Sequence, residues 1–445
     1  MSIASKWHRL GELTKKSGKV IREKGFRSFA GKSCAYLKSF LLRRLGMLPG
    51  EAMVRPRSVS EMVCRAHENL QPLLVFKSPD RGRVPCVNFV TDALGPSLLG
   101  EVGTALILVS QYAARRNMTL RIITRQKRAN PCDYFEFMKL VQEDCPKKAV
   151  FWSDCDRDAS GRHGHPLEIS DSDVFFTDSW WTTSAVRAAE TGCKVFYIVQ
   201  EAEELFYPSG DMRLRCSRQL DCRDVCHIVN SRWLWDYFKN RYPSTVCVNG
   251  TWFEPAFPRF LYQPRMSAAS GRHKLFFHTN PNHPRNLFFT GLEALEEAVL
   301  RGILNPEQWV IYLDGEISDK AGLPEGLAFE RLEEMTPADY ARFLGEVDMT
   351  FSLMCSPNPG YPFLESLASG CVCVTNTFEN KKDCPFCKNA IFRDLSVDAL
   401  CDGLREGVKL ALNKQARRKN FEEMSLPSDW SETLKETLGF MEHSS

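Results

Sequence analysis

The sequence has no uninterrupted apolar run of roughly 18 residues, the length that a membrane-spanning helix needs. The segment from Met1 to Arg27 is also too polar for the hydrophobic core of a signal peptide. Both absences predict a chain that is cytoplasmic and does not cross a bilayer. The 43% of hydrophobic and 25% of charged residues are ordinary for a globular protein, so the chain can build full cores.

A second close cysteine pair is also missing. Cys384 and Cys387 form one Cys-x-x-Cys pair, and no further pair follows at a spacing that would complete the four ligands of a structural zinc site. The 17 cysteines are an odd number in a chain of 445 residues, whereas disulfide scaffolds are small and loop-rich. Many cysteines, such as Cys86, Cys193 and Cys371, stand in apolar runs and suit a core. We therefore expect reduced thiols.

Positive charge is concentrated in the first 50 residues. They contain twelve Lys and Arg against two Glu, a net charge of +10, so the rest of the chain carries −7 within a total of +3. Between Tyr36 and Leu45, aromatic and leucine residues alternate with basic ones, which is typical of an amphipathic helix in a bilayer interface. Residues 1–50 are thus predicted to bind an anionic membrane surface on its inner face. A packed basic helix or a disordered segment is the alternative, and the absence of a basic groove elsewhere argues against nucleic acid.

The length predicts two or three domains, and alternating strand and helix patterns predict parallel βαβ units. A first series of strands is expected at 86–90, 120–124, 149–152, 173–177, 195–199 and 226–229, with helices at 104–114, from about Thr182, and from Arg232 to Tyr242 after the N-cap Ser231. A second series has strands at 274–278, 309–313 and 347–354, and helices around 288–299 and from Thr336.

These patterns predict an α/β fold with two Rossmann-like domains. The expected parts are a basic extension at 1–55, a first domain at 56–252, a proline-containing linker at 253–272, a second domain at 273–426, and a C-terminal segment at 427–445 whose helix crosses back to the first domain.

The most informative stretch is 351–375, which has the pattern of a buried strand, a Pro/Gly loop, a short helix and another strand. Pro362 suits the first helical position, which would place Glu365 in the first turn, at an exposed helix start with a positive field. Gly370 is the expected left-handed cap. A loop after a strand and before a helix is where open α/β sheets bind nucleotides, although a packed unit with a solvated glutamate would share this topology.

The residues of this stretch resemble the nucleotide-sugar site of retaining glycosyltransferases with the GT-B fold, in family 4, and above all the WsaF-like rhamnosyltransferases of bacterial surface-glycan assembly. The matching segments are Ser352-Leu-Met354, the loop Pro357-Asn-Pro-Gly-Tyr-Pro-Phe-Leu-Glu365, and Val374-Thr-Asn-Thr-Phe378. Segments 173–185 and 196–208 of the first domain resemble the same family. The resemblance covers about 84–395 and implies a GT-B enzyme.

The resemblance implies a donor site on the second domain, for a dTDP-type nucleotide sugar with rhamnose as the expected sugar. Glu365 would accept hydrogen bonds from ribose hydroxyls, with Tyr361 stacking or hydrogen-bonding nearby. Arg285 would make bidentate contacts with the diphosphate. Asp314 and Gly315 end another strand, where the glycine lets the backbone approach a base or ribose closely.

The acceptor glycan is expected on the first domain. Glu201 stands in place of the family's aspartate and is the candidate catalytic residue. Gln200, Glu203 and Trp181 are the candidate acceptor-binding residues, and Trp180 is an alternative to Trp181 for stacking on a sugar. A buried tryptophan and a solvated acidic loop would be the structural alternative. Retaining transfer could proceed by attack on the same face, which requires positioning and charge stabilisation more than a strong base.

Two departures from the family pattern matter. Pro357 stands eight residues before Glu365, where many family 4 enzymes have another glutamate. WsaF-like chains also lack that glutamate. Glu333 and Glu334 stand where relatives have a lysine for the diphosphate, and carboxylates there would repel it. Lys381 or Lys382 then substitutes, the donor differs, or activity is impaired. A non-catalytic GT-B protein that binds a nucleotide sugar or scaffolds a glycan assembly complex is therefore the alternative.

The run Asp154-x-Asp156-x-Asp158 does not predict a metal site. As an EF-hand loop it fails, because Ala159 replaces the required glycine and His165 the final glutamate. As a manganese motif it belongs to the other glycosyltransferase fold. We expect neither a metal nor another cofactor.

Overall fold

The structure is a computed structural model that describes residues 58–79, 82–95, 98–155, 166–265, 271–278, 280–281, 283–314, 327, 329–333 and 335–444. The basic segment 1–50, and with it the predicted membrane contact, lies outside these residues, as do Gly315 and Glu334. A short helix, α2 (Val59–Ala66), opens the described chain. The compact unit that begins at Cys64 contains both large β-sheets.

The first domain is built on a seven-stranded sheet in the order β4-β3-β2-β6-β7-β8-β9, in which every pair is parallel. Hydrophobic, largely β-branched and aromatic runs form these strands, and all six residues of β2 are buried. The strands are β2 (Cys86–Thr91), β3 (Thr119–Thr124), β4 (Ala149–Ser153), β6 (Val174–Thr177), β7 (Lys194–Val199), β8 (Cys226–Asn230) and β9 (Gly250–Phe253). A parallel pair, β1 (Val75–Lys77) and β5 (Leu167–Ile169), forms a separate small sheet.

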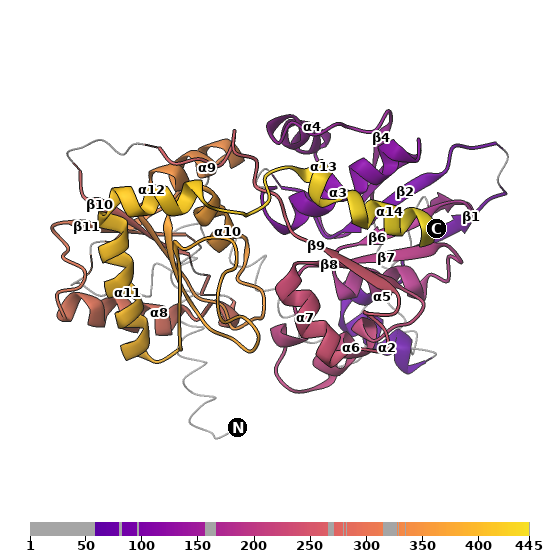
Figure 1. Cartoon of the computed structure of the whole chain (residues 1–445). Helices are drawn as coiled ribbons and strands as arrows, with labels where there is room; N and C mark the ends of the chain where they lie inside the picture. The colour runs from indigo at the N-terminus through magenta and orange to yellow at the C-terminus, as the bar shows by residue number, and fades with distance from the viewer. Residues whose placement is uncertain are drawn as a thin grey trace, which may run out of the picture. The chain divides into compact units, whose positions relative to one another are not determined.

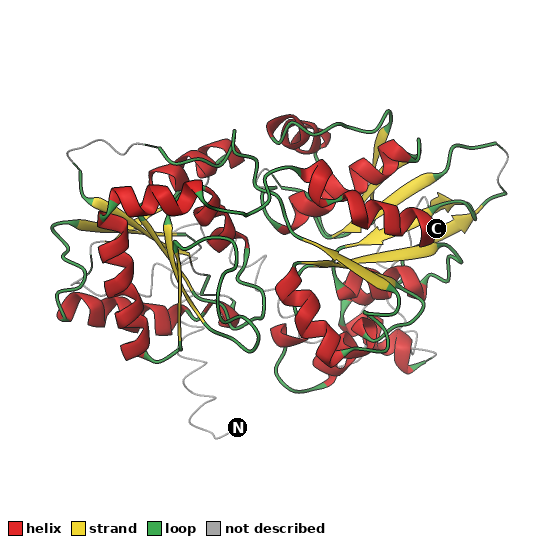
Figure 2. Cartoon of the chain, viewed as in Figure 1, coloured by secondary structure: helices red, strands yellow, loops and turns green. Residues whose placement is uncertain are grey.

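Helices cover both faces of this sheet (Figure 2). They are α3 (Glu101–Arg115), α4 (Pro131–Leu140), α5 (Trp180–Ala188), α6 (Asp211–Leu220) and α7 (Arg232–Arg241), with the short 3-10 helices η1 (Glu68–Leu70) and η2 (Glu203–Phe206). Ser179 and Thr182 form a capping box that starts α5. Ser231 is the N-cap residue of α7, as predicted, but its side chain makes no capping bond, and Glu254 accepts the N–H of Arg232 at 3.0 Å instead.

The second domain has a six-stranded parallel sheet in the order β12-β11-β10-β13-β14-β15. Its strands are β10 (His273–His278), β11 (Trp309–Leu313), β12 (Phe329–Arg331), β13 (Met349–Ser352), β14 (Val372–Asn376) and β15 (Ala390–Arg393). Its helices are η3 (Pro284–Asn286), α8 (Phe288–Leu300), α9 (Pro337–Glu346), α10 (Tyr361–Ala368), α11 (Val397–Leu412) and α12 (Lys414–Glu422). The expected start of α9 is confirmed, since Thr336 Oγ1 accepts from the N–H of Asp339 at 3.2 Å.

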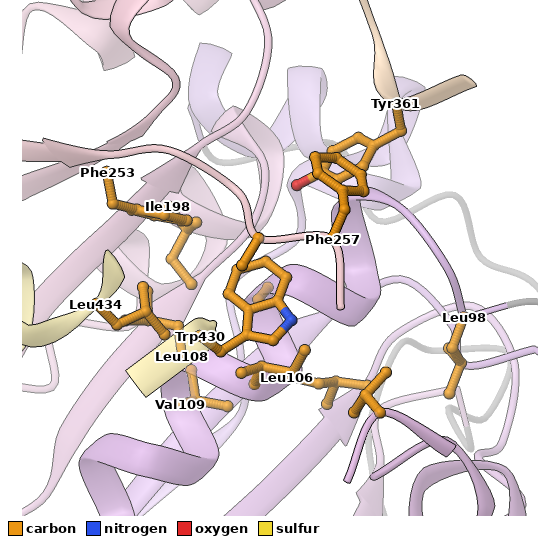
Figure 3. Close-up of a cluster of buried hydrophobic side chains, with 14 of the residues drawn as sticks. Leu98, Leu106, Leu108, Val109, Ile198, Phe253, Phe257, Tyr361, Trp430 and Leu434 are labelled. Carbon is orange, nitrogen blue, oxygen red and sulfur yellow. The ribbon is translucent and has the colours of Figure 1, made fainter. Parts of the chain in front are cut away.

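The C-terminal segment returns to the first sheet (Figure 1). It forms two helices, α13 (Trp430–Thr433) and α14 (Lys435–Ser444), where a single helix was expected. Thr433 Oγ1 donates to the carbonyl of Glu254 at 2.8 Å, just beyond β9. Trp430 is 4% exposed, and Figure 3 shows it in one hydrophobic cluster with residues of α3, β7 and β9. Burying an aromatic side chain contributes about 1.5–3 kcal/mol, so the burial of Trp430 stabilises the packing of the C-terminal segment on the first domain.

The two predicted Rossmann-like domains are therefore present. Helices in the described part of the chain are all too short or too polar to span a bilayer. The cysteines there are free thiols; Cys86 and Cys371 are buried, as their apolar settings predicted, whereas Cys193 is only partly buried.

Candidate functional site

A cavity of about 580 Å³ lies at the carboxyl ends of the strands of the first sheet. Asp92 follows β2, Asp178 follows β6, and Gln200 and Glu201 follow β7. Arg285 enters from η3 of the second domain, so side chains from both domains line the cavity. This edge of a parallel sheet is the usual place for a ligand in an open α/β fold.

Five carboxyl groups line the cavity. Two of them, Glu101 and Asp178, have their pKa raised to about 7, first of all because surrounding protein desolvates them. Glu101 borders open space in the cavity and is exposed there. The carboxyl residues that line the cavity are Asp92, Glu101, Asp178, Glu201 and Glu203. This wall can accept many hydrogen bonds, as a polyhydroxylated ligand requires.

Glu201 is 3% exposed and lines the cavity where β7 ends. Its Oε1 accepts hydrogen bonds from the Ser356 hydroxyl of the second domain and from the N–H of Ala202, the latter at 2.9 Å. Burial raises the pKa of Glu201, and the nearby charges of Arg285 and Lys381 oppose that rise. The predicted catalytic residue thus lies in the cavity, held by a residue of the other domain.

Arg285 lies beside this carboxyl group. Its guanidinium lies over the ring of Phe206, 4.0 Å from the centroid, and its buried Nε has no hydrogen-bond partner among the described residues. The backbone of Arg285 is held by the N–H of Cys355, which donates to its carbonyl at 2.8 Å. A guanidinium that is stacked on an aromatic ring in a cavity wall is suited to bind an anionic group such as a diphosphate.

Glu365 is not placed as the sequence predicted. Gly360, at a positive φ of 84°, precedes α10, which begins at Tyr361, so Glu365 is the fifth residue and lies in the second turn. The side chain is 2% exposed, not at an exposed helix start, and accepts a hydrogen bond from the hydroxyl of Tyr262 at 2.9 Å. Burial raises its pKa to about 7, although Tyr262 and His278 oppose the shift.

Asp314 belongs to the surroundings of Glu365 and not to the cavity. Its Oδ2 pairs with Nδ1 of His278 at 2.5 Å, where β10 and β11 end. Burial lowers the pKa of His278, but the charges of Asp314 and Glu365 raise it. The net effect is a raised pKa. The structure therefore brings Glu365 and Asp314 together around His278, at the edge of the second sheet where a donor was expected. Gly315 lies outside the described residues.

Tyr361 joins the two domains. Its hydroxyl donates to Thr104 Oγ1 of α3 at 2.6 Å and accepts from Asn230 Nδ2 of β8 at 2.5 Å. The ring is 8% exposed and packs 6.2 Å from that of Phe257. Tyr361 therefore reaches into the first domain and not into the cavity.

Gln200 is part of the same network. Its Oε1 accepts from Asn230 at 3.1 Å, and its Nε2 donates to the carbonyl of Glu101 at 2.7 Å. Asn358 of the second domain donates to its backbone carbonyl at 2.9 Å. Gln200 lines the cavity as expected, but these bonds occupy its amide, so its contribution is to hold the cavity wall.

The two tryptophans differ in placement. Trp180 is 1% exposed and belongs to the core, whereas Trp181 lines the cavity and donates from Nε1 to Asp92 Oδ2 at 2.9 Å. Glu203 also borders the cavity, but it accepts from the N–H of Trp180 at 2.8 Å and from the hydroxyl of Tyr197. Burial raises the pKa of Glu203 well above its usual value. Of these residues, Trp181 is the one with an open face for a sugar.

Lys381 is completely buried and is not among the residues that line the cavity. Its Nζ donates to the carbonyl of Met354 at 2.9 Å. Burial lowers its pKa to about 7, and the charges of Glu201 and Cys355 oppose that shift. Glu333 and Lys382 are exposed. Lys381 therefore affects the site through its electrostatic interaction with Glu201. Its buried position does not place it in contact with a diphosphate in the cavity.

Sequence reasoning missed several residues of the site. Asp92 and Asp178 each directly follow a fully buried, largely apolar strand, a pattern that could have identified them. Glu101 lies before the helix predicted at 104–114, but α3 already begins at Glu101. Ser356 and Asn358 carry no such signal, because their partners lie 155 and 158 positions away.

Groups of three or more His, Cys, Asp or Glu that could hold a metal ion do not occur among the described residues. Asp154 is buried in an ion pair with Arg125 at 3.1 Å, and Asp156 and Asp158 lie outside the described part.

Comparisons with known proteins agree with this architecture. The N-terminal domain model of the WsaF family matches residues 87–212, and its C-terminal domain model matches 273–405. The O-antigen biosynthesis protein RfbC of Myxococcus xanthus is 31% identical over 181 residues, which are 40% of this chain and 14% of that protein. The match thus spans about one seventh of the relative's length.

Solved structures with low sequence identity share the fold. Sucrose-phosphate synthase from Thermosynechococcus elongatus has a TM-score of 0.53 at 12% identity, covering 81% of this chain and 98% of that one. Anabaena HepE, in complex with UDP and glucose, has a TM-score of 0.55 at 11% identity, covering 82% and 100%. A mutant TarM of S. aureus, in complex with UDP, has a TM-score of 0.56 at 7% identity, covering 80% and 99%.

The paired Rossmann-like sheets and the returning C-terminal helices define a protein with the GT-B fold of glycosyltransferases. The two domain models match in order and together cover more than half of the 445 residues. The chain belongs to the WsaF family.

Proposed function

We propose that this protein is a retaining glycosyltransferase that moves a sugar, rhamnose, from a dTDP-type nucleotide sugar to a surface-glycan or polysaccharide acceptor. The observation that carries the proposal is the meeting of Glu201 of the first domain and Arg285 of the second in one cavity. A volume of about 580 Å³ is within the range of small-molecule sites, roughly 300–1,000 Å³.

The chemistry of the cavity suits the two substrates differently. Arg285 offers N–H groups to the diphosphate of the donor and stabilises the charge that develops as it leaves. The carboxyl wall and Trp181 offer hydrogen-bond acceptors and a flat apolar face to the acceptor sugar. Burial raises the pKa of Glu201, and a carboxylate with a raised pKa is a better base toward an acceptor hydroxyl.

The residues around Glu365 support a role for the second domain in holding the nucleoside. Glu365, His278 and Asp314 gather where strands β10 and β11 end, which is the expected position for the ribose and base. The relatives support the substrate classes: RfbC is an O-antigen biosynthesis protein, and HepE was solved with UDP and glucose.

A non-catalytic nucleotide-sugar-binding or scaffold protein is the second candidate. It is favoured by the exposed Glu333 in place of the family's lysine and by the position of Lys381 outside the cavity. If the protein is an enzyme, Arg285 is the Arg or Lys residue among those lining the cavity that can neutralise the two phosphate groups of the donor.

The test is a titration of the full-length protein with dTDP-rhamnose, dTDP-glucose, UDP-glucose and GDP-mannose, followed by an assay for nucleoside diphosphate release with glycan acceptors. The proposal expects saturable binding of a dTDP sugar and turnover with an acceptor. Binding without turnover for every acceptor would favour the scaffold, and no binding of any nucleotide sugar would contradict both candidates.

A further inference from the structure

A second cavity of about 580 Å³ lies in the second domain, away from the candidate active site. Asp348, which immediately precedes β13, and Gly370, which lies two residues before β14, form part of its wall. It therefore lies at the amino ends of parallel strands, whereas the loops that carry Cys355 and Tyr361 leave their carboxyl ends. The other walls come from 259–265, the segment that connects the two sheets, and from α12.

The walls of this cavity carry a large excess of positive charge. Asp348 and Glu422 are the acidic residues among those lining it, and both are already engaged: Arg417 pairs with Asp348 at 2.8 Å, and Arg418 with Glu422 at 2.9 Å. The five basic residues, here called the basic pocket, are Arg259, Arg265, Lys414, Arg417 and Arg418.

Three cations of the basic pocket have no acidic partner within the described chain: Arg259, Arg265 and Lys414. They are exposed, and they come from two segments far apart in the sequence. Like charges repel each other, so gathering them around one hollow is unfavourable unless an anion occupies it. An anion of two or three charges would balance the excess.

The pocket is held in shape by close backbone packing. The N–H of Arg265 donates to the carbonyl of Gly345 at 2.7 Å, and a Cβ at Gly345 would lie 2.6 Å from the carbonyl of Gln263. Gly370 has a φ of +82°, and a Cβ there would lie 2.5 Å from the ring of Pro264. These glycines let the connecting segment lie directly on the second domain.

One wall is also braced by a cation–π contact. The guanidinium of Arg259 lies over the ring of Phe421 on α12, 5.4 Å from its centroid. This contact fixes the direction of the guanidinium without neutralising it. The charges of the connecting segment and of α12 thus face one hollow of defined shape.

We propose that the basic pocket binds a phosphate-bearing anion, either a free phosphate compound or the headgroup of an anionic lipid. Guanidinium groups form paired hydrogen bonds with phosphate oxygens, and a lysine adds a mobile charge. A single compact hollow suits one phosphate group and its substituent, whereas a nucleic acid backbone needs a long track of cations. The bound anion would hold the connecting segment against α12.

The test uses the full-length protein and three variants. Arg265→Gln/Lys414→Gln removes two unpaired charges of the pocket and keeps side-chain length. Arg115→Gln/Arg116→Gln removes two exposed arginines from the first domain and is the matched control. Arg285→Gln removes the anion-binding guanidinium of the other cavity. Each protein is titrated calorimetrically at low salt, because screening weakens exposed charges. One probe is inorganic phosphate, and the other is monomeric dihexanoyl phosphatidylglycerol.

The pocket variant is expected to bind at least one probe about ten-fold or more weakly than the wild type, because it loses two charged hydrogen-bond donors of the pocket. The arginine control and Arg285→Gln should keep that binding. Loss with both probes indicates a general phosphate site, and loss with the lipid alone indicates a headgroup site. Equal affinities of the wild type and the pocket variant for both probes, or no binding by the wild type, would overturn the proposal.

Discussion

The hydroxyl group of Tyr361 donates a hydrogen bond to Thr104 Oγ1 at 2.6 Å, across 257 positions of the sequence. The same loop of the second domain supplies Asn358, which binds the carbonyl of Gln200, and Ser356, which binds the carboxylate of Glu201. The loop that the family resemblance assigns to the donor therefore also fastens the second domain to the cavity wall of the first.

Replacing Tyr361 by Phe tests this fastening. The ring remains, but Thr104 and Asn230 lose their buried partner, so we expect the free energy of unfolding to fall by about 1–3 kcal/mol. Urea unfolding measures the loss, and a dTDP titration of the same variant should show little change in affinity. If the Phe variant instead kept full stability and lost dTDP affinity, Tyr361 would be a donor ligand, as the sequence suggested.

The sequence predicted the strands better than the contacts between domains. Strands such as β2 and β14 are fully buried and largely apolar, and burial on both faces of a parallel sheet produces that pattern. The start of α10 was predicted one residue late, so Glu365 was expected as the fourth residue of the helix and is the fifth. The hydrogen bonds of Ser356 and Tyr361 depend on how the two domains pack against each other. The spacing of apolar residues along the chain contains no information on that packing.

The titration of Glu365 should appear in the pH dependence of stability. Burial raises its pKa in the folded protein to about 7 from an ordinary value of 4.5. The folded state then holds a proton that the unfolded state has lost, so this group lowers stability as pH rises from 4.5 to about 7. Its neutral isostere, Glu365→Gln, should be more stable than the wild type at pH 8, by an amount on the order of 3 kcal/mol.

The measurement is urea unfolding of both proteins from pH 4 to pH 8, with the exposed Glu136→Gln as control. The difference between Glu365→Gln and the wild type should vanish at the acid end, where both side chains are neutral. A Gln variant less stable than the wild type at pH 8 would mean that Glu365 is ionised and stabilised in the fold.

Donor binding should depend on Arg285. Its guanidinium is stacked on Phe206 in the cavity wall, so Arg285→Gln is expected to weaken dTDP binding about ten-fold or more. Arg285→Lys keeps the charge but not the planar fork, and should recover only part of the affinity. Titration calorimetry gives both values. Unchanged affinity in the Gln variant would remove Arg285 from the donor site.

The basic segment 1–50 is predicted to hold the protein on anionic bilayers. Each of its twelve basic residues contributes about 1 kcal/mol only near the surface, and screening over about 8 Å limits that reach at physiological salt. The full chain should co-sediment with vesicles containing phosphatidylglycerol at low salt and release at high salt. A chain that begins at Val54 should stay in solution, and equal sedimentation of the two chains would exclude the segment as the anchor.

Glu201 is the residue on which the proposed transfer depends most. Glu201→Gln keeps an oxygen that can accept from Ser356 but cannot take a proton, so turnover should fall by about a hundred- to ten-thousand-fold. Donor affinity should be nearly unchanged, because the proposed donor contacts come from the second domain. Glu201→Asp, the family's usual residue, should keep substantial activity.

Steady-state transfer with the cognate donor and acceptor, together with a dTDP-sugar titration, measures both effects for Glu201→Gln, Glu201→Asp and the control Glu136→Gln. A fall in turnover without a change in donor affinity separates a role at the acceptor hydroxyl from general damage to the cavity. Because Ser356 bonds to Glu201, Ser356→Ala should cause a smaller fall in the same direction. Near wild-type turnover of Glu201→Gln would show that this carboxyl group only shapes the wall. The acceptor hydroxyl would then be activated by the leaving diphosphate alone.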